Sequence, residues 1–77
     1  MSRRTILITF ENVRVDKVVA TLDDEGIMTL GGTATSVMIE TCKDRDTLEN
    51  IIHNINGGAW CNVEDISDDE DLIDSYL

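Results

Sequence analysis

Residues 44–58 read DRDTLENIIHNINGG, and they decide how the rest of this 77-residue chain is interpreted. Their large apolar residues recur at intervals of three and four, the spacing that places side chains on one side of a helix. This apolar stripe consists of Leu48, Ile51, Ile52 and Ile55. Asp46 and Glu49 match a capping box at the helix start, and Asn56-Gly57-Gly58 is typical of a helix end. The stretch therefore predicts a helix.

The segments on both sides of this helix favour β-strands. Residues 27–42 predict two strands, joined by Gly31-Gly32 and the small polar residues through Ser36. Residues 59–66 predict a last strand with side chains on two faces. One face carries Ala59, Cys61 and Val63, and the other carries Trp60, Asn62 and Glu64.

The N-terminal third predicts a strand followed by a helix. Residues 3–12 alternate in the manner of a strand, and residues 15–26 carry valines and a leucine at helical spacing. Asp16 is placed to cap this helix, and Gly26 is placed to end it in the left-handed conformation. β-branched valines also suit a strand, so the rival prediction is a strand over 15–22 within an all-β meander.

The preferred order of elements is β-α-β-β-α-β. This order predicts an α+β protein of ferredoxin-like arrangement, with a four-stranded antiparallel sheet and two helices on one face. We expect residues 1–66 to form this single domain and residues 67–77 to add an acidic C-terminal helix or tail.

The C-terminal stretch 64–77 has the pattern of a short helix. Ser67 and Glu70 match a capping box, and an apolar seam lies opposite acidic residues on a helical wheel. The seam is Leu72, Ile73, Tyr76 and Leu77, and the opposite arc is Glu70, Asp71 and Asp74. Asp69 does not fit, since it points into the apolar arc. The pattern predicts a helix over 68–76 that packs against the body or a partner, and the alternative is a frayed tail.

Charge is concentrated at this C-terminal end. The chain has 16 acidic and 6 basic residues, for a net charge of −10. Residues 64–77 hold seven acids and no base, whereas residues 1–63 hold nine acids and six bases. Residues 23–25 form a second acidic patch. Such a charge repels nucleic acid and anionic membranes and attracts basic proteins.

No pattern for catalysis or cofactor binding is present, so we expect neither an enzyme nor a cofactor. A single histidine, His53, falls on the polar side of its helix, and the glycine pairs lack a phosphate-binding context. Residues 65–76 fail as a calcium loop, because Glu70 replaces the required glycine and Tyr76 the bidentate glutamate. We expect no metal site, no direct nucleic-acid binding and no membrane association.

The two cysteines, Cys42 and Cys61, lie in apolar strand-like contexts. No secretory signal precedes them. We therefore expect two reduced, inert core thiols in a cytoplasmic protein.

The favoured function is a small acidic inhibitor or modulator that occupies the basic surface of a nucleic-acid-binding protein. In size, acidity and lack of catalytic residues the chain resembles the DNA-mimic inhibitors that bacteriophages encode, and the resemblance implies a host RNA polymerase, nuclease, restriction or CRISPR effector, or repressor as target. No motif of those inhibitors is matched. The candidate partner-binding residues are Glu64, Asp65, Asp68, Glu70, Asp71 and Asp74, a second patch of Asp23, Asp24 and Glu25, and Trp60.

Two other functions stay open. One is a small ligand-binding or regulatory ferredoxin-like domain that forms a homodimer, with the loop 31–36 as the binding site and Lys43 and Arg45 as the nearest basic groups. The other is a structural accessory subunit kept soluble by its acidity. Trp60 is expected to lie under the third helix, and the alternative is that it belongs to an exposed apolar patch.

Overall fold

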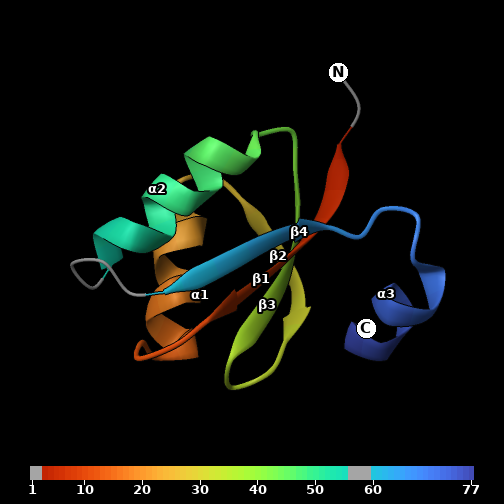
Figure 1. Cartoon of the computed structure of the whole chain (residues 1–77), viewed down its shortest axis with the longest axis horizontal. Helices are drawn as coiled ribbons and strands as arrows, with labels where there is room; N and C mark the ends of the chain where they lie inside the picture. The colour runs from red at the N-terminus through yellow and green to blue at the C-terminus, as the bar shows by residue number, and fades with distance from the viewer. Residues whose placement is uncertain (1–2, 56–59) are drawn as a thin grey trace.

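The computed structural model describes residues 3–55 and 60–77, which contain four β-strands in one sheet and three helices (Figure 1). In chain order the elements are β1 (Arg4–Phe10), α1 (Val15–Asp24), β2 (Met28–Gly32), β3 (Ser36–Thr41), α2 (Arg45–Ile55), β4 (Cys61–Asp65) and α3 (Glu70–Tyr76). The predicted α+β class is confirmed. The all-β alternative is wrong, because residues 15–24 are helical.

The strands are arranged in the order β2-β3-β1-β4, and every neighbouring pair is antiparallel. The N-terminal strand β1 is therefore central, with β3 on one side and β4 on the other. Ile6 lies opposite Ile39 of β3 and opposite Asp65 of β4. β2 and β4 form the two edges of the sheet.

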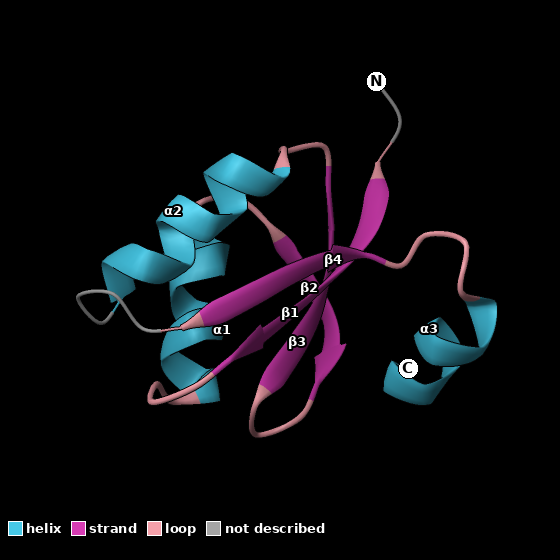
Figure 2. Cartoon of the chain, in the orientation of Figure 1, coloured by secondary structure: helices cyan, strands magenta, loops and turns pink. Residues whose placement is uncertain are grey.

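Helices α1 and α2 pack together on one face of the sheet (Figure 2). Alternate side chains of β1 point toward these two helices, because successive residues of a strand face opposite sides. The buried cluster on this face consists of Ile6, Ile8, Phe10, Val18, Leu22, Ile27, Val37, Ile39, Leu48, Ile52 and Val63. The apolar stripe predicted for residues 48–55 thus contributes two fully buried side chains, Leu48 and Ile52.

Helix α3 covers the opposite face of the sheet. Leu7, Met38 and Ile66 are buried there, and Leu30, Leu72, Ile73 and Tyr76 pack against them. The prediction of a docked C-terminal helix is confirmed, and the frayed tail is wrong. The helix begins at Glu70, two residues after the predicted start.

The helix caps differ from those predicted from the sequence. α2 begins two residues earlier than the Asp46 capping box implies, because the Asp44 carboxylate accepts a hydrogen bond from the Thr47 N–H at 2.9 Å. In α3 the cap is Asp69, whose carboxylate accepts from the Leu72 N–H at 3.2 Å. Asp69, which did not fit the apolar arc of the predicted helix, is therefore the residue that caps it.

The first helix also starts without the predicted cap. Arg14 occupies the capping position and forms no side-chain cap hydrogen bond, and Asp16 lies in the first helical turn, where its negative charge suits the helix dipole. The predicted end is confirmed, since Gly26 has a φ of 74°. The predicted helix stop at residues 56–58 and the strand residue Ala59 lie outside the described residues.

Gly31 and Gly32 belong to β2 and not to the connection that follows it. The ladder between β2 and β3 shifts register between Thr29 and Gly31, as at a β-bulge. A methyl group added at Gly31 would collide with the backbone carbonyl of Tyr76 in α3. Gly31 therefore permits the close approach of α3 to the edge of the sheet.

We predict that Gly31→Ala displaces α3 from the sheet at a cost of about 1–3 kcal/mol, the usual penalty for overpacking. Hydrogen exchange should show faster exchange of the α3 amides than in the wild-type protein. Gly26→Ala is the control: it meets no neighbouring atom and is strained only by its positive φ, so it should lower global stability while α3 stays protected. Unchanged exchange in the Gly31 variant would contradict the proposed contact.

Candidate functional site

The outer surface of α3 is acidic. Leu72, Ile73 and Tyr76 point toward the sheet, and the helical repeat therefore directs the remaining side chains outward. Glu70, Asp71 and Asp74 are all exposed, as predicted from the helical wheel. We call these three residues the α3 acidic face. The first two lie in the first turn, where negative charge is favourable.

Tyr76 fixes the C-terminal end of α3 to the hairpin between β2 and β3. Its hydroxyl group shares a hydrogen bond of 3.0 Å with the hydroxyl of Ser36, which shares one of 2.8 Å with the hydroxyl of Thr33. Ser36 is one of two buried polar side chains among the described residues. The small polar loop singled out in the sequence thus anchors the acidic helix.

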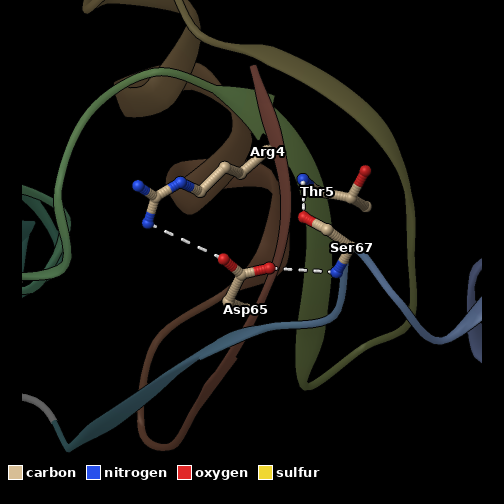
Figure 3. Close-up of polar contacts among 4 residues, drawn as sticks. All are labelled: Arg4, Thr5, Asp65 and Ser67. Atoms are coloured by element: carbon tan, nitrogen blue, oxygen red, sulfur yellow. Dashed lines mark hydrogen bonds and ion pairs between the residues drawn. The ribbon is translucent and has the colours of Figure 1, made fainter. Parts of the chain in front are cut away.

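The N-terminal end of α3 is connected to the sheet through Ser67 (Figure 3). The Thr5 N–H donates to the Ser67 hydroxyl at 3.0 Å, and the Ser67 N–H donates to the Asp65 carboxylate at 3.0 Å. The backbone N–H of Ile66 also donates to the carbonyl of Thr5 at 2.9 Å. Ser67 therefore holds the chain against β1 instead of capping α3 as predicted.

Strand alternation separates Glu64 from Asp65. Glu64 lies opposite Leu7 and Asp65 lies opposite Ile6, and residues paired across a ladder share one face. Glu64 is thus on the face covered by α3, whereas Asp65 is on the face of α1 and α2. Glu64 joins the side of the molecule that carries the α3 acidic face.

Asp65 is partly neutralised by its neighbours. Hydrogen bonds from Ser67 lower its pKa, and Arg4, whose guanidinium lies 3.8 Å from its carboxylate, adds to the effect. Asp65 is exposed, so this ion pair adds little stability. Of the predicted acidic residues, Asp65 is the one that the fold places beside a basic side chain and away from α3.

The other predicted acidic residues divide between two surfaces. Asp68 is exposed in the turn before α3, next to the α3 acidic face. Asp23, Asp24 and Glu25 are exposed at the end of α1, which packs on the opposite face of the sheet. The second patch is therefore separate from α3.

Trp60 does not pack under α3, so that prediction is wrong. Its side chain is 53% exposed, and its carbonyl accepts a hydrogen bond from the Glu11 N–H at 3.2 Å. Met28 and Leu77 are the other large exposed apolar side chains among the described residues. The α3 helix covers Leu7, Met38 and Ile66 instead.

The cysteines are less buried than predicted. Cys42 is exposed because it follows the last residue of β3, and Cys61 is half-buried; both are free thiols. Burial raises the pKa of the Cys61 thiol, and the nearby Glu49 carboxylate acts in the same direction. A raised pKa makes this thiol a poor nucleophile.

His53 is exposed, as its place on the polar side of α2 predicts. Within residues 3–55 and 60–77, no three His, Cys, Asp or Glu side chains gather in a way that could hold a metal ion. In the same part of the chain, no helix is both long and apolar enough to cross a bilayer.

Sequence reasoning missed a basic pocket of about 540 Å³. It is lined by Arg4, Ile6, Lys43, Arg45, Asn62, Val63, Glu64 and Asp65. Lys43 and Arg45 lie after the C-terminal end of β3, whereas the small polar loop lies before its start. They therefore cannot serve that loop as predicted. Only the register of β1 with β3 and β4 brings Arg4 close to them, so no short sequence pattern signals the pocket.

Comparisons of the chain with models of protein families, with curated proteins and with solved structures give no match.

The contacts of Asp65 predict a pH dependence. A carboxylate with a lowered folded-state pKa stabilises the native state above its unfolded pKa of about 3.9, and the benefit disappears as the pH falls through the folded value. We expect Asp65→Asn to unfold at a lower urea concentration than wild type at neutral pH, and the difference to vanish in acid.

The control for this prediction is Asp68→Asn. It removes the same charge from an exposed side chain that forms no hydrogen bond or ion pair with the described residues. At neutral pH, Asp68→Asn should therefore not show the lower urea midpoint of unfolding that is expected for Asp65→Asn. A difference between Asp65→Asn and wild type that persists unchanged in acid would refute the role assigned to the Asp65 carboxylate.

Proposed function

We propose that this protein is a small acidic inhibitor or modulator that occupies the basic nucleic-acid site of another protein. The observation that carries the proposal is the α3 acidic face, in which Glu70, Asp71 and Asp74 are exposed on a helix that docks through its apolar side, whereas Leu77 of the predicted seam is exposed. Carboxylates held in place lose less conformational freedom on binding than those of a flexible tail.

The average density of these charges supports mimicry of a nucleic-acid strand. A seven-residue helix is about 10.5 Å long at 1.5 Å per residue, so three outward carboxylates give about one charge per 3.5 Å. One strand of duplex DNA carries one charge per about 3.4 Å. The average charge density along α3 therefore matches that of one DNA strand, although the individual steps are unequal, about 1.5 Å from Glu70 to Asp71 and about 4.5 Å from Asp71 to Asp74.

The target class follows from this charge. The proposal fits a nucleic-acid enzyme with a basic groove, such as an RNA polymerase, a nuclease, or a restriction or CRISPR effector, and it also fits a repressor. Phage-encoded inhibitors are the setting in which such mimics are used. Electrostatic attraction would speed encounter at low salt. The protein would act by occupancy in the cytoplasm, without catalysis, metal or cofactor.

We further propose that the fold is ferredoxin-like. The strand order β2-β3-β1-β4, the antiparallel pairing and the common face of α1 and α2 support this assignment. In this arrangement the second face of the sheet is left open by the two crossover helices. Helix α3 is then an addition that fills this face.

The test is capture of partners from a bacterial lysate with the tagged protein. We expect basic nucleic-acid-binding proteins to be retained at low salt and released by high salt or added duplex DNA. The triple variant Glu70→Gln/Asp71→Asn/Asp74→Asn should weaken the purified complex by about tenfold or more, because charge-assisted contacts are lost. It keeps the Asp69 cap, so α3 can still form.

The matched control is Asp23→Asn/Asp24→Asn/Glu25→Gln, which removes the same charge from the end of α1. This variant should retain the partner with at most a small loss. Partners that bind equally well at all salt concentrations, and equally well to the α3 variant, would rule out the proposal.

A further inference from the structure

The basic pocket draws its charges from three parts of the chain. Arg4 comes from β1, Lys43 from the segment after β3, and Arg45 from the first turn of α2. Three of the six basic residues of a chain with net charge −10 therefore line one pocket. Like charges gathered in this way are costly unless something of opposite charge compensates them.

Among the described residues, two carboxylates on the pocket side of the sheet offset these cations: Asp65, which lines the pocket, and Glu49 of α2, which pairs with Arg45. Asp65 shares the face of Ile6 and Val63, whereas the side chain of Glu64 belongs to the α3 face by strand alternation. Glu64 and Asn62 also line the pocket, where it borders the edge strand β4. The lining thus holds three basic and two acidic residues, and strand alternation directs the side chain of one of the acidic residues, Glu64, toward the other face.

The cations are only partly engaged within the protein. Arg4 lies 3.8 Å from the Asp65 carboxylate, and Arg45 lies 3.2 Å from that of Glu49, both in exposed ion pairs. Exposed pairs of this kind are weak and exchange readily. The Lys43 ammonium forms no ion pair or hydrogen bond with the described residues. An incoming anion could therefore recruit it without breaking a contact.

The edge of β4 adds backbone donors to the same pocket. The carbonyl of Trp60 and the N–H of Ile66 both bond to the β1 side, so even-numbered residues between them point toward β1 and odd-numbered residues point away. Val63 and Asp65 line the pocket and direct their N–H groups outward from an edge strand. These donors complement an acceptor-rich ligand.

From these observations we propose that the pocket binds a small anionic ligand through a carboxylate or phosphate group. Arg4, Lys43 and Arg45 supply the charge, and the edge of β4 supplies hydrogen bonds. The volume is in the range of small-molecule sites, and the polar lining favours a charged ligand. The site lies on the face opposite α3, so it goes beyond the proposed function and can fail or succeed independently.

The experiment is titration of the 15N-labelled full chain with inorganic phosphate and, separately, with citrate, at constant ionic strength. We expect saturable amide shifts confined to residues 4–6, 43–45 and 62–65. Saturation by phosphate alone would identify a phosphate ligand, and saturation by citrate alone would identify a carboxylate ligand. Shifts identical to those produced by sodium chloride would overturn the proposal.

Lys43→Gln should weaken binding by about tenfold, the effect of losing one charge-assisted contact, and it disturbs no ion pair. Asp65→Asn should instead strengthen binding several-fold, because it releases Arg4 from its competing carboxylate. The double variant Arg14→Gln/Lys17→Gln removes two exposed bases outside the pocket and should leave the affinity unchanged.

Affinities that respond equally to the Lys43 variant and to the Arg14/Lys17 variant would show that binding depends on net charge alone, and would overturn the site. Saturable amide shifts confined to β4 that are unchanged in Lys43→Gln would also overturn the site. They would point to strand addition at the sheet edge instead. The thermal midpoint of each variant, measured by circular dichroism, verifies that it is folded.

Discussion

The structure depends on a sheet whose two central strands are apolar on both faces. Ile6, Leu7 and Ile8 of β1 are consecutive and buried, and so are Val37, Met38 and Ile39 of β3. Since alternate side chains point to opposite faces, such runs require cover on both sides. Helices α1 and α2 cover one side, and α3 covers the other, where Leu30 of β2 also packs against the buried residues.

This requirement explains why the acidic C-terminal segment is ordered. A seven-residue helix is marginal in water on its own, and its exposed carboxylates repel one another. Burial of Leu72, Ile73 and Tyr76 over Met38 and Leu7 offsets that repulsion. The same docking fixes which side of the helix faces solvent. The position of the α3 acidic face is thus a consequence of the two-sided core, whatever its partner is.

Sequence periodicity was sufficient for the types of the elements and for the docking of α3, because helical stripes and strand alternation are local signals. Helix caps were less predictable from the sequence, because Asp44, Asp46 and Asp69 all carry the same carboxyl group. Which of them caps a helix depends on the local backbone geometry. Trp60 and Cys42 were misplaced because each lies just beyond a strand end, where alternation stops applying. The pocket was invisible, since Arg4 and Lys43 are neighbours only through the pairing of β1 with β3.

Strand alternation also explains how a chain of net charge −10 keeps a basic pocket. Glu64 and Asp65 are adjacent in sequence, yet β4 sends one to the α3 face and the other to the α2 face. Had both carboxylates shared the pocket side, they and Glu49, which pairs with Arg45, would equal the three cations there in charge. Because Ser67 and Arg4 hold Asp65 in place, it opposes only part of that charge. The sheet therefore separates the α3 acidic face from the basic pocket, although the sequence that forms both is overwhelmingly acidic.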